Sequence, residues 1–145
     1  MNRSFCKTGP RPDQTKEGLT VTIVDTCFLI DLMKGDSGAE QIALENKQLK
    51  TTAISSAEFL TGAKRSNKKT VYKISEKFIR FFPVLPFDAE SAVVYARITH
   101  TLSGTGRHIS SFDELIAAIA LRNNEPLVTR DQHFKTIDGL DIIAY

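Results

Sequence analysis

Four acidic residues stand where regular structure is expected to begin or end: Asp25, Glu58, Asp113 and Asp131. Asp25 follows the β-branched run Val21-Thr22-Ile23-Val24, which predicts a buried strand, and Asp131 follows another short apolar run. In an open α/β sheet, ligands bind outside the carboxyl ends of the strands. Carboxylates gathered there repel one another unless a cation or a shared proton neutralises them. The set therefore predicts a cation site with oxygen ligands.

The acids also have a plainer interpretation, in which they belong to the caps of helices. Asp is among the best N-cap residues, so Asp25 and Asp131 would each suit the start of a following helix or turn. Ser55 and Glu58 have the spacing of a capping box, in which Glu58 would only satisfy a backbone N–H. Ser111 and Glu114 have the same spacing, which would leave Asp113 free of that role. Because four carboxylates at one edge repel one another even where they cap helices, we favour the cation hypothesis.

The accompanying residue types indicate which cation. No His or Cys has metal-ligand spacing beside these acids, so Mg²⁺ or Mn²⁺ is expected rather than zinc. The two cysteines, Cys6 and Cys27, predict neither a zinc site nor a disulfide. A reducing, cytoplasmic environment is therefore expected.

The elements that would position the acids alternate along the chain. Helical patterns separate the β-prone segments, which favours a parallel sheet covered on both faces. The expected fold is a three-layer α/β/α sandwich with a central parallel sheet of about five strands. The expected strands are residues 21–24, 51–54, 84–85, 126–128 and 141–144.

Length and composition are those of one soluble domain. The 145 residues are 41% hydrophobic and 25% charged, and no apolar run approaches the roughly 20 residues that span a membrane. Residues 1–19 are polar and contain Gly9-Pro10-Arg11-Pro12, without the apolar centre of a signal peptide. We expect a flexible extension over residues 1–19 and a single folded domain over residues 20–145.

Basic residues concentrate in one segment. Residues 64–80 contain seven Lys and Arg against one acid, Glu76, and apolar residues recur among them at helical spacing. We expect one amphipathic helix whose basic face is either a solvated surface or a phosphate-binding surface.

Two other features carry no chemistry. Asp88 precedes a helical pattern and is expected only to cap it. Gly104 and Gly106 form a Gly-x-Gly in an expected loop over residues 103–108, but they lack the third glycine and the strand-turn-helix setting of a dinucleotide site.

The acids and their neighbours resemble the PIN domain, in the branch of VapC-type toxins from type II toxin-antitoxin modules. The resemblance covers residues 21–145 and rests on four motifs that occur in order along the chain. These are Asp25-Thr26 after the first strand, Ser55-x-x-Glu58, Asp113-Glu114-Leu115-Ile116-Ala117-Ala118, and Leu127-Val128-Thr129-x-Asp131-x-x-Phe134.

The resemblance implies roles for individual residues. Asp25 and Asp113 would bind the metal directly, with Asp131 as a further ligand, and Glu58 would bind metal or orient water. Thr26 and Thr129 match hydroxyl positions beside the acids, and with Arg130 they are expected to contact substrate or support the ligands. Cys27 departs from the Asn or Ser of many relatives, so a supporting hydrogen bond is expected to be missing.

The resemblance also implies Mg²⁺-dependent endoribonuclease activity, in which an activated water hydrolyses RNA phosphodiester bonds. A small VapB-like antitoxin and a homodimer would be its protein partners, and no membrane association is expected. The alternative is a PIN-domain protein outside the toxins, either an RNA-processing enzyme or a non-cleaving RNA-binding protein. A phosphatase of the haloacid dehalogenase type would need a second Asp at position 27, where this chain has Cys.

Overall fold

Five parallel strands form the centre of the molecule. The computed structural model describes residues 21–46 and 48–145, so the expected extension over residues 1–19 and Cys6 lie outside the described residues. The strand order is β3-β2-β1-β4-β5, and every pairing is parallel, as predicted. The strands are β1 (Val21–Val24), β2 (Gln48–Thr52), β3 (Val84–Leu85), β4 (Leu127–Val128) and β5 (Ile142–Ile143).

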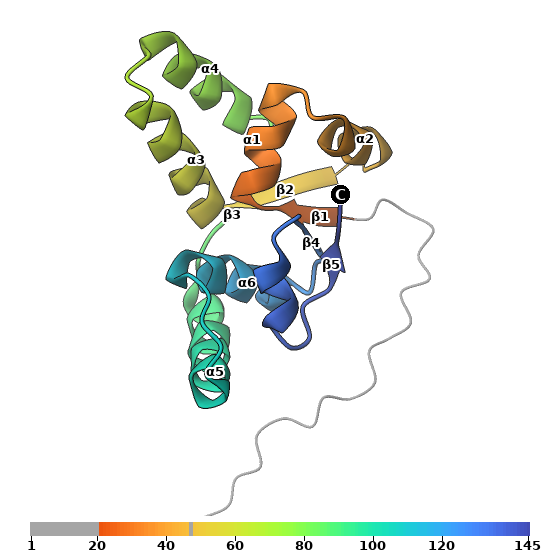
Figure 1. Ribbon diagram of the computed structural model, residues 1–145, viewed down its shortest axis with the longest axis vertical. Helices are drawn as coiled ribbons and strands as arrows, with labels where there is room; N and C mark the ends of the chain where they lie inside the picture. The colour runs from red at the N-terminus through yellow and green to blue at the C-terminus, as the bar shows by residue number, and fades with distance from the viewer. Residues whose placement is uncertain (1–20, 47) are drawn as a thin grey trace, which may run out of the picture.

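Helices cover both faces of this sheet, which confirms the three-layer prediction. Figure 1 shows α1 to α4 on one side of the strands and α5 and α6 on the other. The helices are α1 (Thr26–Lys34), α2 (Ser37–Glu45), α3 (Ala53–Arg65), α4 (Lys69–Ile79), α5 (Ala89–Thr105), α6 (Ser111–Asn123) and the 3₁₀ helix η1 (Gln132–Thr136). Among the described residues, none of these helices has the length and apolar character needed to cross a bilayer.

The central strands divide their side chains between two cores. Successive residues of a strand point to opposite faces, so Ile23 packs with α5 and α6 while Val24 packs with α1 and α3. Leu127 and Val128 on the neighbouring strand β4 divide in the same way. A strand covered on both faces needs a continuous apolar run, which explains why residues 21–24 were recognisable from sequence.

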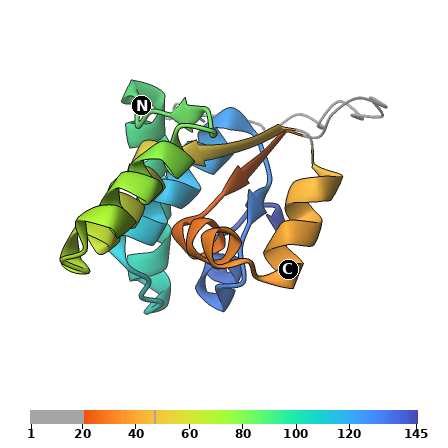
Figure 2. The same cartoon turned by 90° about the horizontal axis from the view of Figure 1, so that it is seen from above.

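The prediction of one basic helix over residues 64–80 is wrong. The chain turns after α3, with Asn67 in the left-handed region at φ 56°, and α4 begins at Lys69. The two helices lie side by side and extend beyond the sheet as a hairpin (Figure 2), held in part by the rings of Phe59 and Phe78 at 5.7 Å. Lys64 and Arg65 therefore belong to a different helix from the basic residues of α4.

Both predicted capping boxes are also wrong. Helix α3 begins earlier than expected because Thr52, the last residue of β2, is its N-cap and accepts a hydrogen bond from the backbone N–H of Ser55. Ser110 rather than Ser111 caps α6, and its hydroxyl oxygen accepts from the N–H of Asp113. Glu58 and Glu114 are consequently not capping residues.

Smaller differences concern element ends. Strand β2 is residues 48–52 rather than 51–54, while β4 and β5 are shorter than expected by one and two residues. Helix α5 continues through Gly104 and ends at Gly106, whose φ of 67° suits glycine, so half of the expected loop is helical. Asp88 caps α5 as predicted.

Candidate functional site

The topology of the sheet creates a site at its carboxyl edge. Strand β1 is central, with β2 on one side and β4 on the other. From β1 the chain adds β2 and β3 on one side and β4 and β5 on the other, so the strand order reverses at β1. At such a reversal α/β proteins have a crevice in which they bind ligands. Asp25 follows β1, and Thr129 and Asp131 follow β4, so both neighbouring strands deliver polar side chains to this point.

Asp25 is the most buried of the four acids, with 3% of its surface exposed. Its Oδ1 accepts a 2.8 Å hydrogen bond from the N–H of Phe28, which makes it the N-cap of α1, and its Oδ2 accepts from the hydroxyl of Thr129. Burial raises the pKa of Asp25 to about 6, and the charges of Asp113 and Asp131 add to this rise while both hydrogen bonds oppose it. The residue is therefore a cap and also a carboxylate whose charge is unfavourable without a neutralising partner.

Asp113 reaches the same edge from the first turn of α6. Its pKa is raised chiefly by partial burial and also by Asp131, while a hydrogen bond with the Ser110 side chain lowers it. Because α6 is apolar on nearly all sides and packed in the core, this acid stands on a rigid support.

Glu58 lies in the second turn of α3, opposite the first turn of α1. Thr26 donates its hydroxyl hydrogen to Oε1 of Glu58 at 2.8 Å. Burial raises the pKa of Glu58, the hydrogen bond from Thr26 lowers it, and Asp113 raises it further. The side chain of Thr26 thus fixes one oxygen of this carboxylate.

Asp131 is the N-cap of η1 and remains partly exposed. Its Oδ1 accepts from the N–H of His133 at 2.9 Å, and Nδ1 of His133 lies 2.9 Å from the same oxygen. Its own N–H donates to Oγ1 of Thr129, the residue that also donates to Asp25. Thr129 therefore links Asp25 to the segment that carries Asp131.

We call Asp25, Glu58, Asp113 and Asp131 the acidic edge. They lie close enough for three of them to show pKa values raised by another member of the set. Within residues 21–46 and 48–145, however, no three His, Cys, Asp or Glu side chains are spaced to hold a metal ion together. Mg²⁺ keeps several waters and is commonly bound through only one or two carboxylates, so this all-oxygen set fits Mg²⁺ or Mn²⁺ without enclosing it.

Arg130 is held beside the acidic edge by a contact that the sequence pattern did not reveal. Its Nε lies 3.2 Å from Oδ2 of Asp31 on α1, and this carboxylate raises the pKa of the guanidinium. Tyr145 donates its hydroxyl hydrogen to the same oxygen at 2.7 Å. Asp31 is 7% exposed, and an acid inside the apolar run Phe28-Leu29-Ile30-Asp31-Leu32-Met33 was the available signal for a buried, partnered carboxylate.

Cys27, the residue that departs from the resemblance, is partly buried near Asp25. Burial raises the pKa of its thiol, and the charge of Asp25 raises it further. The thiol is thus kept protonated, which suits a supporting position better than a metal ligand.

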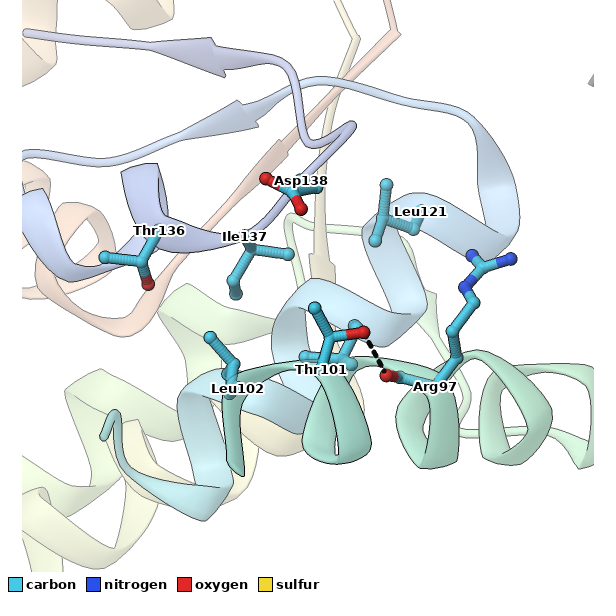
Figure 3. Close-up of a pocket in the computed structure, with 8 residues that line it drawn as sticks. Arg97, Thr101, Leu102, Leu121, Thr136, Ile137 and Asp138 are labelled. Carbon is cyan, nitrogen blue, oxygen red and sulfur yellow. Dashed lines mark hydrogen bonds between the residues drawn. The ribbon is translucent and has the colours of Figure 1, made fainter. Parts of the chain in front are cut away.

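A separate hollow of about 130 Å³ lies between α5, α6 and η1 (Figure 3). Thr101 at its wall donates its hydroxyl hydrogen to the backbone carbonyl of Arg97 at 3.0 Å. None of the four acids contributes to its lining. This hollow is therefore distinct from the acidic edge.

Comparisons with known proteins agree with this fold. The family model described as PIN domain matches residues 22–140. Ribonuclease VapC1 of Rickettsia felis is 32% identical over 127 residues, which cover 84% of this chain and 94% of that protein.

Solved structures give the same result. The crystal structure of VapBC2 from Rickettsia felis bound to a DNA fragment from their promoter matches with a TM-score of 0.77 at 24% identity, over 87% of this chain and 99% of that chain. VapBC-1 from nontypeable Haemophilus influenzae matches with a TM-score of 0.72 at 27% identity, over 86% of this chain and 98% of that chain. The fold, the family model and the curated relatives agree, and the chain belongs to the PIN domain family, in its VapC branch.

Proposed function

We propose that this protein is a divalent-metal-dependent endoribonuclease that acts as the toxin of a toxin-antitoxin pair. The observation that carries the proposal is the acidic edge, where one buried and three partly buried carboxylates meet at the crevice of the sheet and repel one another. The names of the curated relatives, ribonuclease VapC, supply the reaction class. Keeping ionisable groups with raised pKa values together costs stability and is characteristic of functional sites.

In this proposal Asp25 and Asp113 hold Mg²⁺ or Mn²⁺, with Asp131 as a further ligand. When bound, the cation lowers the pKa of water and offsets charge that develops on the phosphate oxygens. Glu58 orients the attacking water with Oε2, because Thr26 already occupies Oε1. Thr129 holds Asp25 in place, and Arg130, held by Asp31, presents a positive charge to the RNA beside the acids.

The test is incubation with total RNA in Mg²⁺, with and without EDTA, followed by mapping of the fragment ends. Wild-type protein should cut RNA only when metal is available. Asp25→Asn and Asp113→Asn should each lower cleavage by about 100-fold or more, since even outer partners of metal ligands contribute about 10–100-fold. Asp88→Asn is the matched control, because Asp88 caps α5 and is not one of the acids of the acidic edge.

If both edge variants cut at the wild-type rate, the nuclease proposal is wrong. If wild-type protein binds RNA and never cuts it in Mg²⁺ or Mn²⁺, the chain is instead a non-cleaving RNA-binding protein of the same fold.

The protein partners follow from the same proposal. The matching crystal structures are titled as VapBC assemblies, which supports a small VapB-like antitoxin as partner. We further propose a homodimer. Expression in a bacterial host should arrest growth for wild type and spare it for Asp25→Asn, and light scattering of the purified variant should give twice the chain mass.

A further inference from the structure

A second charged site lies at the tip of the α3–α4 hairpin. A hollow of about 420 Å³ opens there between the end of one helix and the start of the next. We call it the basic hollow. Its lining residues are Lys64, Asn67, Lys68, Lys69, Tyr72 and Lys73.

The four lysines of this hollow keep their charges available. All four are exposed, and among the described residues no carboxylate lies within salt-bridge distance of their ammonium groups. The ammonium of Lys64 sits over the ring of Tyr72, 3.7 Å from its centroid, so this cation is held at the wall by the aromatic face. Four unpaired cations around one hollow repel one another, which an anionic ligand would relieve.

The excess positive charge of the chain is concentrated in this hairpin. Residues 64–80 contain seven basic residues and one acid, which leaves twelve basic and sixteen acidic residues for the rest of the chain. A polyanion attracted to this protein is therefore directed to the hairpin rather than spread over its surface.

The placement relative to the acidic edge is also favourable. Glu58 and Lys64 lie on the same helix, six residues apart, which is about 9 Å along the helix axis. The hairpin extends outward from the end of the sheet at which the acids lie (Figure 1). An RNA strand with one phosphate at the acidic edge can reach the basic hollow with a nearby nucleotide.

We propose that the basic hollow binds the phosphate backbone of single-stranded RNA beside the cleaved bond, an inference that rests on the proposed function. Lysine ammonium groups bind phosphate as point charges without requiring one orientation, which suits a backbone of any sequence. The amide of Asn67 adds a hydrogen-bonding group on the same wall. The hollow therefore contributes affinity and the position of the strand rather than base recognition.

The test measures binding of a fluorescein-labelled single-stranded RNA oligonucleotide by anisotropy, in EDTA and at several salt concentrations. Lys69→Ala/Lys73→Ala should make the plot of log Kd against log salt shallower by about 1.4, at about 0.7 for each lost phosphate contact. Lys77→Ala/Arg80→Ala is the control, because it removes the same charge from the last turn and the C-cap of α4, outside the hollow. It should change the slope by less than half as much.

Single Lys69→Gln and Lys73→Gln changes keep a polar side chain of nearly the same length without the charge, and each should shift the slope by about 0.7. Equal slopes for wild type and the hollow variants would overturn the proposal, as would equal changes in hollow and control variants. Binding of poly-glutamate with the same lysine dependence, while RNA binding is unchanged, would overturn it in favour of an acidic protein partner. Because cleavage plays no part in this measurement, a protein that binds through the hollow but never cuts would contradict only the proposed function.

Discussion

The acidic edge and the basic hollow are both clusters of like charge, but the fold treats them differently. Asp25 is 3% exposed, and Glu58 and Asp113 are partly buried, so each has a pKa above its usual range. The lysines of the hollow project from the tip of a hairpin into solvent. Water and salt screen the exposed charges of these lysines, and they screen the buried charges of the acidic edge much less.

The two clusters therefore differ in how much their charges cost the stability of the folded protein. At the acidic edge, repulsion is part of the folded state, and in the proposed function a bound cation relieves it. At the basic hollow, the charge is exposed to solvent and costs little stability, and in our proposal it acts directly on the RNA backbone. Substitutions at the first cluster should therefore change stability and pH dependence, and substitutions at the second should change mainly the response to salt.

The largest expected effect is on the stability of metal-free protein as a function of pH. The folded-state pKa of Asp25 is about 6, above its ordinary value of 3.8, so the folded chain holds this proton more tightly than the unfolded chain. The contribution of Asp25 to stability should thus be greatest below about pH 4 and be lost as pH rises through 6. Asp25→Asn has no titrating group at this position and so does not lose this stability. As pH rises from about 4 to above 6, the unfolding free energy of the variant should increase relative to that of wild type by about 3 kcal/mol.

Urea unfolding in EDTA between pH 4 and 8 measures this difference. Asp88→Asn is the control, because hydrogen bonds from Ser91 lower the pKa of Asp88, so its difference from wild type should stay constant over this pH range. If the difference in unfolding free energy between Asp25→Asn and wild type does not vary with pH, the charge of Asp25 is not unfavourable in the folded protein. The acidic edge and the basic hollow would then not differ in the way described above.

The next effect is stabilisation by metal. Mg²⁺ or Mn²⁺ bound at the acidic edge should add about 1.4 kcal/mol to the unfolding free energy when free metal is ten times its Kd. Thermal melts should show a higher Tm for wild type and a much smaller rise for Asp25→Asn and Asp113→Asn. Lys69→Ala/Lys73→Ala should rise as wild type does, and a loss of the rise in that variant would mean that the two clusters are not independent.

A smaller effect is expected at Thr26. Thr26→Val keeps the branched shape but removes the hydroxyl that donates to Oε1 of Glu58. Cleavage should fall by about tenfold, the lower end for partners of metal-site residues. The pKa of Glu58 should rise further, because the hydrogen bond that favours its charged form is lost.

Rates measured across pH test this prediction. The acidic limb should move to higher pH in Thr26→Val and stay in place in Thr26→Ser, which keeps the hydroxyl. A uniform loss of rate at every pH would assign Thr26 to packing rather than to the orientation of Glu58.

The smallest expected effect is on the stability of the hairpin. Lys69→Ala/Lys73→Ala should change the unfolding free energy by no more than about 0.5 kcal/mol, because these side chains are exposed and carry no ion pair among the described residues. Chemical denaturation of this variant beside wild type provides the measurement. A larger loss would show that the lysines support the fold, and the comparison drawn above would then fail.

The acids and the strands that carry them were predictable because their signals are local. A β-branched run buried on both faces is visible in residues 21–24, and Asp25 directly follows it. The alternation of strands and helices then required a parallel sheet, and its carboxyl edge gathers whatever side chains follow the strands. The roles of these acids remain predictions for the cleavage and binding measurements.

The cap of α3 was not predictable, because it depends on where strand β2 stops pairing. Thr51 lies opposite Val24 in the sheet, and β2 continues to Thr52, so Thr52 rather than Ser55 becomes the N-cap of α3. That change releases Glu58 from the capping box and allows it to accept a hydrogen bond from Thr26, which is 32 residues away in the chain. Sequence spacing alone could not distinguish these two uses of one carboxylate.

Sequence by itself determined the kinds of element, the parallel sheet and the edge to which the four acids belong, because each depends on periodicity within a few residues. Tertiary structure alone decided that β4 lies beside β1, that Thr129 donates to Asp25, and that residues 64–80 turn into a hairpin with a hollow at its tip. Arg130 likewise depends on Asp31 and Tyr145, which come from α1 and from beyond β5. These contacts join segments far apart in the chain, and the packing of both cores, rather than any local preference, selects them.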